Sequence, residues 1–286
     1  MKLLIVPNDI NKIDEYINIG CEGIIVGLKD FSTNYNVELS IDEIRELKNK
    51  YKDIEIFISA NKNIFNDELK TLEENLIELD NININGVLFY DLSIPYLRNK
   101  NNLNLDLVWN QTHMVTNYNT CNYYHDFGVE YAYLSTEITL DEINEIKEKT
   151  DMKLMAFGFG YPVMAHSRRS LLTNYFLNRN KEYDGRVCNI YDDKNKFSVK
   201  EDETGTTFLN DEFINGTCLI TNSNVDYVIA SNDLVEEEVF KKLVSLISSL
   251  MNNKNERLVG EIEELIGNNT NFFFKKTIFM VKKDEK

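Results

Sequence analysis

Five polar side chains follow short apolar runs of the sequence and are our candidates for catalysis. They are Asn61, Asp91, Asn110, His113 and Glu137. Amide, carboxylate and imidazole groups bind substrates and move protons when they converge on one site. Asn61 and Asp91 could instead cap the helices that follow them, and His113 could be an ordinary loop histidine. We expect Glu137 to face the site, because it precedes Thr139, the predicted start of the next helix.

A second candidate site is the segment 165–176, Ala-His-Ser-Arg-Arg-Ser-Leu-Leu-Thr-Asn-Tyr-Phe, which follows the glycine-rich run Gly158-Phe159-Gly160. Its paired arginines carry planar forks that bind phosphate or carboxylate through two hydrogen bonds. The simpler alternative is a set of salt bridges to some of the 47 acidic side chains. The position beyond an apolar strand favours an anion site. The residues that we assign to it are Arg168, Arg169, Ser167, Asn117 and Tyr175.

Other kinds of active site find less support in the sequence. The 3 histidines, His113, His125 and His166, do not have the spacing of metal ligands, so we predict no metal site. His166 and Ser167 are adjacent, so their side chains point apart and do not form a nucleophile–base pair. Cys121 and His125 share one helical face, but a half-buried cysteine beside a solvent-facing histidine is the simpler interpretation.

Strand ends would have to position these candidate residues. The sequence alternates short apolar runs, typical of strands, with amphipathic stretches, typical of helices. The strands that we predict are 2–7, 23–27, 55–60, 86–90, 105–110, 131–135, 153–157 and 226–230. The helices that we predict are 10–19, 41–50, 66–80, 93–99, 117–127, 140–149, 233–252 and 255–266. Ser40, with Glu43 three residues later, predicts a capping box at the start of one of them. Such an alternation indicates βαβ units and a parallel sheet.

Eight strands favour the α/β class with a TIM-like (β/α)8 barrel over an open doubly wound sheet. The GxGxxG sequence typical of the open sheet is missing after the first strand. In a barrel, strand ends gather at one mouth, where the polar candidates would meet. Residues 158–225 look irregular and indicate a functional insertion. We therefore predict a barrel domain at 1–232 that includes the insertion, then two helices and a basic, β-like tail, Asn271–Lys283, packed on the barrel at 233–286.

The composition limits the classes of partner and compartment. The formal net charge is −16, which argues against general binding of polyanions but leaves room for a local basic site. No apolar run of about 18 residues exists, so we expect no membrane span. The apolar run at the N-terminus is too short for a signal peptide, and we expect a cytoplasmic protein. Its four cysteines have no CxxC pair and are expected to be free thiols.

Several stretches of the sequence resemble the U32 peptidase family, which includes collagenase-like proteases. They are 167–176, 109–112 with 116–123, 134–139 (Leu-Ser-Thr-Glu-Ile-Thr) and 205–218. Thr136 stands where the family has an arginine. The resemblance covers residues 1–230 well and the rest loosely. It implies a TIM-like barrel and, beside the peptidase label, oxygen-independent hydroxylation, including prephenate-dependent formation of 5-hydroxyuridine at the wobble position of tRNA.

The resemblance also implies an iron–sulfur cluster on four cysteines in many family members. Here Val163 and Ser170 stand at two of those cysteine positions, and Cys188 and Cys218 match the other two. Two thiolates do not make the usual four-cysteine site, so we predict no cofactor. The chain is similar to the shorter, cysteine-poor paralogue that accompanies a longer U32 protein in some bacteria.

Three functions follow as hypotheses, and whether the chain is an enzyme on its own stays open. It could be a component of tRNA hydroxylation, a peptidase, or a non-catalytic partner subunit of a cluster-bearing longer paralogue. Binding of tRNA would need a local basic face, because the chain is acidic overall. The residues that could form that face are Arg168, Arg169, Arg179, Lys181, Arg186, Lys275, Lys276, Lys282 and Lys283.

Overall fold

Eight parallel strands close into a barrel in the computed structural model, which describes residues 1–192, 195–268 and 271–274. The barrel strands are β1 (Lys2–Val6), β2 (Gly23–Leu28), β4 (Glu55–Ala60), β5 (Gly86–Phe89), β6 (Leu107–Trp109), β7 (Tyr131–Tyr133), β8 (Lys153–Gly160) and β14 (Tyr227–Ser231). Pairing of β1 with both β2 and β14 closes the ring. The two-residue strand β3 (Glu38–Leu39) extends the sheet beside β2. The predicted TIM-like barrel is confirmed.

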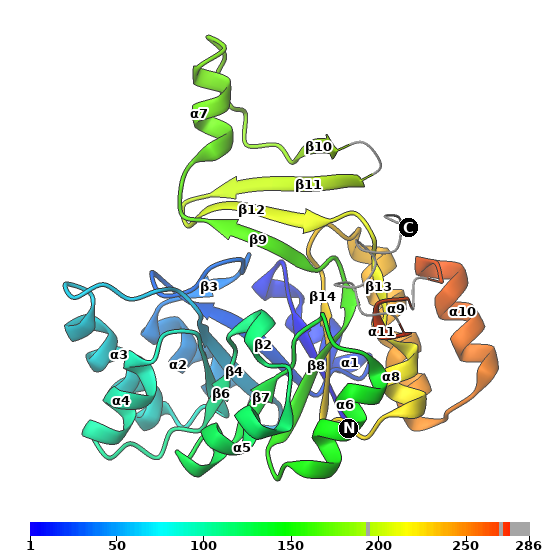
Figure 1. The fold of residues 1–286 in the computed structure, drawn as a ribbon, viewed down its shortest axis with the longest axis horizontal. Coiled ribbons are helices and arrows are strands. Elements are labelled where there is room, and N and C mark those ends of the chain that lie inside the picture. Colours follow the sequence, from blue (N-terminus) through cyan, green and yellow to red (C-terminus); the bar gives the residue numbers. More distant parts are fainter. Residues whose placement is uncertain (193–194, 269–270, 275–286) are drawn as a thin grey trace, which may run out of the picture.

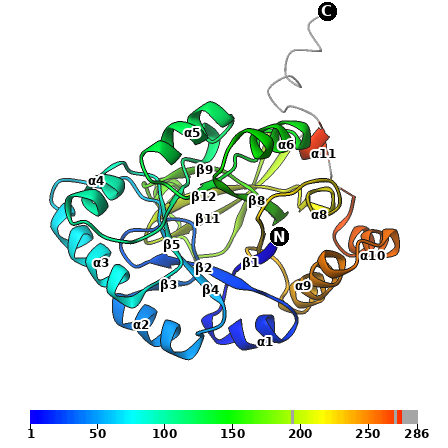
Figure 2. The ribbon, with the colours of Figure 1, turned by 90° about the horizontal axis from the view of Figure 1, so that it is seen from below.

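Helices surround the barrel, as Figure 2 shows from below. They are α1 (Ile13–Asn18), α2 (Ile41–Lys50), α3 (Leu69–Ile82), α4 (Ser93–Lys100), α5 (Tyr118–Asp126), α6 (Leu140–Lys149), α8 (Thr217–Asn222) and α9 (Glu237–Asn252). Short 3-10 turns, η1 (Ile10–Lys12) and η2 (Thr112–Met114), precede α1 and α5. The predicted capping box of Ser40 and Glu43 opens α2, and Thr139 opens α6 in the same way. Local capping signals therefore fix where these helices begin.

Two apolar layers stabilise the barrel. Side chains alternate along each strand between the interior and the surrounding helices. The interior layer contains Leu4, Ile25, Phe57, Leu88, Val108, Tyr131, Met155, Tyr227 and Ile229. The outer layer, between strands and helices, is larger and includes nearly all the buried helix residues. Strands buried on both faces are apolar throughout, which explains why they could be found in the sequence.

The predicted irregular stretch after β8 is in fact mostly regular. It contains β9 (Val163–Ser167), α7 (Leu171–Leu177), β10 (Cys188–Asp192), β11 (Asn195–Asp202) and β12 (Gly205–Asn210). These strands form an antiparallel sheet in the order β10-β11-β12-β9, which we call the cap sheet. It lies above the carboxyl ends of the barrel strands, and α7 projects further outward (Figure 1). The chain then returns through β13 (Ile214–Asn215), which pairs antiparallel with β8.

The chain continues past the barrel in α9, α10 (Glu256–Ile266) and α11 (Asn271–Phe274). The β-like tail predicted from Asn271 is wrong at 271–274, where the chain is helical. Phe273 is buried, and burying that apolar ring outweighs the local strand preference. The remainder of the predicted tail, 275–283, lies outside the described residues. Within those residues, no helix is both long and apolar enough to cross a membrane.

Candidate functional site

The barrel mouth carries a layer of inward-facing side chains one step above the apolar interior. Alternation from Phe57, Leu88, Val108 and Tyr131 places Ser59, Tyr90, Asn110 and Tyr133 in this layer. The full layer, which we call the mouth layer, is Val6, Ser59, Tyr90, Asn110, Tyr133 and Phe157, with Tyr35 from the loop after β2. Its aromatic members are half-buried, so part of each ring is exposed to solvent.

Two phenols of the mouth layer, Tyr35 and Tyr133, are neutral. Burial raises the pKa of Tyr35 to about 12, with a smaller opposing effect of the nearby Ser59 hydroxyl. Burial also raises the pKa of Tyr133, and Tyr35 adds to that rise. Both groups therefore keep their protons at neutral pH and can donate hydrogen bonds. This mouth favours ligands with hydrogen-bond acceptors and a flat face.

The structure brings one of the five catalytic candidates into this layer. Asn110 is inward-facing and 6% exposed. Asn61 instead holds the loop after β2, where its Oδ1 accepts the Thr33 N–H at 2.9 Å and its Nδ2 donates to the Thr33 carbonyl at 3.1 Å. Asp91 accepts the Ser93 N–H at 2.8 Å at the start of α4 and the Ile64 N–H at 3.1 Å. Asn61 and Asp91 therefore brace loops.

The remaining two candidates lie on the rim. His113 is exposed in η2, and its Nδ1 is 3.2 Å from the Thr112 hydroxyl. Glu137 is also exposed, and its backbone N–H donates to Ser135 Oγ at 3.1 Å. Neither side chain has a described contact with the mouth layer. The five candidates therefore do not converge as a set.

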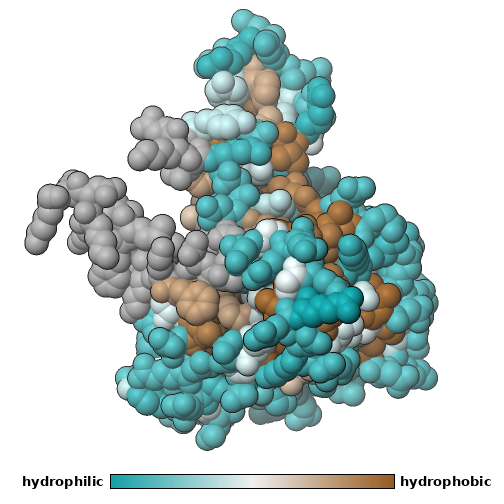
Figure 3. Space-filling view, turned by 90° about the vertical axis from the view of Figure 1, so that its right-hand side faces the viewer, coloured by the Kyte–Doolittle hydropathy of each residue, from teal (hydrophilic) through white to brown (hydrophobic). Residues whose placement is uncertain are grey.

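The predicted anion residues lie along the cap sheet and α7 rather than around one point. Arg168 and Arg169 are exposed, and the Arg168 guanidinium lies 4.7 Å from the ring centroid of Phe65 on the mouth rim. Tyr175 on α7 is exposed and stacks under Arg179 at 4.5 Å. The Ser167 hydroxyl accepts the Arg169 N–H at 3.4 Å. Figure 3 shows the projection above the barrel, largely hydrophilic toward its tip.

Asn117 takes no part in that group. It caps α5, where its Oδ1 accepts the Thr120 N–H at 2.9 Å.

The backbone N–H groups in the first turn of α7 already have a hydrogen-bond acceptor. Glu201 on β11 accepts those of Leu172 and Thr173 at 2.7 and 3.1 Å. Partial burial alone would raise the pKa of the Glu201 carboxyl, but the hydroxyls of Thr173 and Thr206 together with these two N–H groups lower it overall. The chain's own carboxylate thus occupies the helix end that an anion could have used.

Polar contacts dock the cap sheet on the mouth. Lys200 of β11 pairs with Asp233, after β14, at 2.6 Å and donates to Asn36 at 3.0 Å. Thr207 donates to Asn34 in the loop after β2, and His166 Nδ1 is 3.0 Å from the same hydroxyl. Burial lowers the pKa of His166, so this imidazole is neutral at pH 7. Sequence reasoning missed Lys200 and Asp233, since no local pattern pairs residues so far apart.

The four family cysteine positions do not fit an iron–sulfur cluster. Val163 and Ser170 provide no thiolate and are exposed. Cys218 is buried in α8, and burial raises the pKa of its thiol to about 12. Cys188, half-buried at the start of β10, is the other thiol. One valine, one serine and one deeply buried thiol leave the usual four-thiolate ligand set incomplete.

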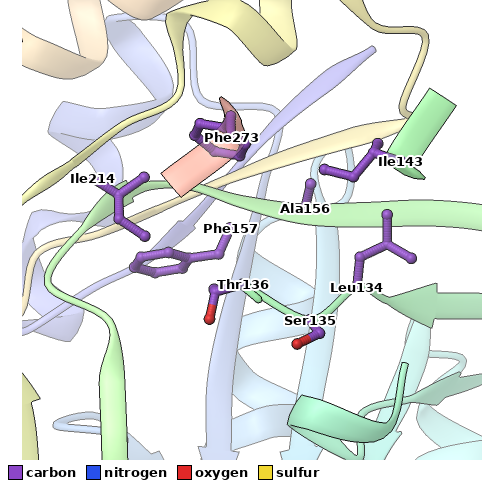
Figure 4. Close-up of a pocket in the computed structure, with 8 residues that line it drawn as sticks. All are labelled: Leu134, Ser135, Thr136, Ile143, Ala156, Phe157, Ile214 and Phe273. Carbon is purple, nitrogen blue, oxygen red and sulfur yellow. The ribbon is translucent and has the colours of Figure 1, made fainter. Parts of the chain in front are cut away.

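A small pocket lies behind the mouth, where β7 and β8 end. Its lining includes Ser135, Thr136, Phe157, Ile214 and Phe273 (Figure 4). Phe157 and Thr136 belong to the mouth side, whereas Ile214 and Phe273 come from the segments that follow the cap sheet. The pocket is mostly apolar, so it supports packing of α11 more than catalysis.

Of the mouth layer, only Asn110 was among the predicted site residues, and Ser59, Tyr35, Tyr90 and Tyr133 are its polar members that the sequence analysis missed. Ser59 and Tyr133 stand on strands that were predicted, so the missing information was which face points inward. Parallel barrel strands are buried on both sides and so carry apolar residues on both faces. The sequence therefore does not show which face points into the barrel. Tyr35 lies in a loop and had no periodic signal at all.

Comparisons with known proteins identify relatives of this chain. The sequence model of Peptidase family U32 matches residues 8–251. Over 97% of this chain and 99% of the relative, it is 25% identical to tRNA hydroxylation protein P2 of Bacillus subtilis. An uncharacterized protease of Methanocaldococcus jannaschii is 28% identical over 63% of this chain and 45% of its own length.

Solved structures with a similar course include thiamine phosphate pyrophosphorylase from Pyrococcus furiosus. It is 11% identical, with a TM-score of 0.44, and the match covers 91% of this chain and 96% of that one. The family match extends over most of the barrel and the whole cap sheet. The chain belongs to the U32 peptidase family.

Proposed function

We propose that this chain is a component of tRNA hydroxylation and acts in the formation of 5-hydroxyuridine at the wobble position. The observation that carries the proposal is the end-to-end similarity to tRNA hydroxylation protein P2, which spans 97% of this chain and 99% of that relative. A match over both whole chains supports a shared role more strongly than a match to one shared domain. The longer relative of the same bacterium, tRNA hydroxylation protein P1, matches over 64% of this chain.

The charge distribution supports an RNA partner. Five cations stand in the stretch 168–186 against two carboxylates, in a chain with a net charge of −16. Arg168, Arg169, Arg179 and Lys181 are exposed, and Tyr175 beside them offers an aromatic face. Exposed guanidinium groups bind phosphates, and exposed rings stack on unpaired bases. This group, Arg168, Arg169, Tyr175, Arg179 and Lys181, is the tRNA-binding surface that we propose.

The incomplete cysteine set favours a second role within the same process, that of a subunit beside a longer, cluster-bearing U32 protein. Val163 and Ser170 at two family cysteine positions support dependence on a partner for redox chemistry. The peptidase alternative has weaker support, because His166 contacts Thr207 and no described contact joins it to Ser167. A nucleophile beside a base would be needed.

The test is deletion of the gene from its own organism, with mass spectrometry of tRNA nucleosides. We expect 5-hydroxyuridine and its derivatives to fall, and wild-type chain to restore them. Replacement of Arg169 and Arg179 by serine should restore less, whereas Lys70→Ser on α3, 88% exposed, should restore fully. Unchanged nucleosides in the deletion strain would refute the proposal. Release of peptides from gelatin by the purified protein would favour the peptidase instead.

A further inference from the structure

The outer edge of the cap sheet has no neighbouring strand. Among the described residues, β10 pairs with β11 on one side and with nothing on the other. In an edge strand, the N–H and carbonyl groups of alternate residues point away from the sheet and are free to bind another strand. The opposite edge strand, β9, lies next to the barrel, whereas β10 is furthest from it (Figure 1). β10 is therefore the edge that another protein molecule can reach.

The side chains along this edge are apolar and exposed. Val187, Ile190 and Tyr191 are 44%, 43% and 72% exposed. Native proteins commonly protect a free strand edge with a lysine, a proline or a β-bulge, because a bare edge pairs with other chains. β10 reads Cys-Asn-Ile-Tyr-Asp, without lysine or proline, and its register with β11 is regular. The edge therefore has the features of a strand that another strand covers.

The sequence of the edge is complementary to itself. If two copies pair antiparallel about a two-fold axis at Asn189, Val187 lies opposite the partner's Tyr191. On the other face of the sheet, Cys188 lies opposite the partner's Ile190. An axis at either neighbouring residue would instead set Asn189 opposite an apolar side chain of the second copy. The axis at Asn189 is thus the register that matches apolar residues with apolar residues.

Charge is complementary in the same register. Arg186 precedes the strand, its side chain is 84% exposed, and the register sets it opposite the partner's Asp192, an acidic residue. The two-fold axis repeats the pair, so opposite charges meet at both ends of the paired strands. Arg186 contacts Asp184 of its own chain at 2.5 Å, and its guanidinium has five N–H groups, enough for a second carboxylate.

Both kinds of complementarity identify the partner as a second copy of this chain. An interface between identical surfaces must match itself across the axis, whereas an interface with a different chain need not. We infer that the free edge of β10 binds β10 of a second copy, antiparallel about Asn189, so that the two four-stranded cap sheets join into one continuous sheet. This pairing goes beyond the proposed function and does not depend on it.

Sedimentation velocity of the full-length chain measures the association. We expect a monomer–dimer equilibrium at about 1–100 µM, because a small interface of this kind gives modest affinity. Ile190→Lys puts a charge on the edge of each copy and should weaken the dimer at least about tenfold. Phe127→Lys makes the same kind of change on α5, at a side chain that is 58% exposed, and should leave the dimer unchanged. Circular dichroism verifies that both variants are folded.

A charge exchange tests the register. Arg186→Asp sets like charges opposite each other and should weaken the dimer about tenfold. Adding Asp192→Arg to that variant reverses both charges and should restore the affinity to within about twofold.

Disulfide formation tests the position of the axis. In a Cys188→Ser background, Asn189→Cys should oxidise to a covalent dimer with copper phenanthroline, because the two copies of this position face each other. Lys70→Cys in the same background, at a side chain that is 88% exposed on α3, should stay monomeric.

Several results would overturn the inference. They are a chain that stays monomeric at about 100 µM, an association that Ile190→Lys leaves intact, and a charge exchange that restores nothing. Association with a longer U32 protein but not with a second copy would also overturn it, since another chain would then cover β10. None of these results decides the proposed function, which the tRNA nucleosides of the deletion strain test separately.

Discussion

Glu201 shows how one side chain can decide what a segment is able to bind. Its carboxylate accepts two backbone N–H groups of α7 and the hydroxyls of Thr173 and Thr206 at 2.5 and 2.7 Å. Thr206 Oγ1 also lies 2.8 Å from the Arg169 carbonyl oxygen, so its single proton is shared between that carbonyl and Glu201. The arginine segment is therefore held rigidly from inside, with its guanidinium groups directed outward. Its anion-binding capacity belongs to the side chains and not to the helix end.

Replacement of Glu201 by glutamine should lower the free energy of unfolding by about 1–2 kcal/mol at pH 7, because a charged cap becomes a neutral one. The pKa of Glu201 is held below its ordinary value in the folded protein. Its contribution is therefore complete above the unfolded pKa of about 4.3 and is lost as the pH falls through the folded pKa. Urea unfolding of both proteins at pH 7 and pH 3 measures the difference.

The difference between wild type and Glu201→Gln should be smaller at pH 3 than at pH 7, because the carboxylate begins to lose its charge as the pH falls toward its lowered pKa. Glu203→Gln, an exposed change on the neighbouring turn, is the matched control and should alter stability little at either pH. An unchanged gap at pH 3 would show that shape and not charge makes the glutamate important.

The thiols give a second prediction at the scale of single residues. Cys21, Cys121 and Cys218 are buried, and burial raises the pKa of each to about 12. Thiolates are the reactive form, so these three should not react with Ellman's reagent in the folded protein at pH 8. Cys188 is half-buried and should be the one thiol titrated per chain. Cys188→Ser should abolish the signal, and all four should react in urea. Rapid reaction of a second thiol in the native state would contradict the burial.

At the scale of elements, the chain just after β13 passes so close to β8 that Gly216 has no room for a side chain. A Cβ on Gly216 would lie 2.6 Å from the Gly158 Cα and carbonyl oxygen, a distance that backbone atoms do not tolerate. The chain leaves the barrel through β8 and returns through β13, so this contact anchors the cap sheet at its base.

Gly216→Ala should therefore destabilise the protein by about 1–3 kcal/mol, as overpacking does. Gly260→Ala is the matched control, because nothing lies within 4 Å of its Cβ position in α10. That change should stabilise the protein by up to about 1 kcal/mol through helix propensity. Thermal unfolding followed by circular dichroism checks both. A neutral Gly216→Ala would show that β13 moves away at little cost.

The strands of the barrel and the cap sheet also show how much of the fold could be predicted from the sequence. The eight barrel strands were predictable because each is a short apolar run between stretches with helical periodicity, one of which, α2, is also marked by the Ser40 capping box. The cap sheet was not, because β10, β11 and β12 mix polar with apolar residues and contain no continuous apolar run. Of the candidate site, Asn110 was found. Ser59 was not, since doubly buried strands give no sign of which side chains point inward, and Tyr35 was not, since it lies in a loop.

At the scale of the whole molecule, the relation between cap sheet and barrel decides access to the mouth. The described contacts between them are largely polar, and the Lys200–Asp233 pair is central, with side chains 13% and 12% exposed. Asn36 joins Asp233 at 3.2 Å, so the loop after β2 that carries Tyr35 is part of the same group. A buried ion pair specifies one position of the cap sheet more than it stabilises the fold.

Breaking the pair should loosen the cap sheet over the mouth. Lys200→Met leaves the Asp233 carboxylate buried without its cation and should cost about 3 kcal/mol, whereas Lys200→Met with Asp233→Leu should recover part of that loss, because no lone charge remains. Hydrogen exchange measured by mass spectrometry should quicken in β11 and in residues 33–37, with α2 and α3 unchanged. Uniform exchange changes throughout the barrel would indicate global destabilisation instead.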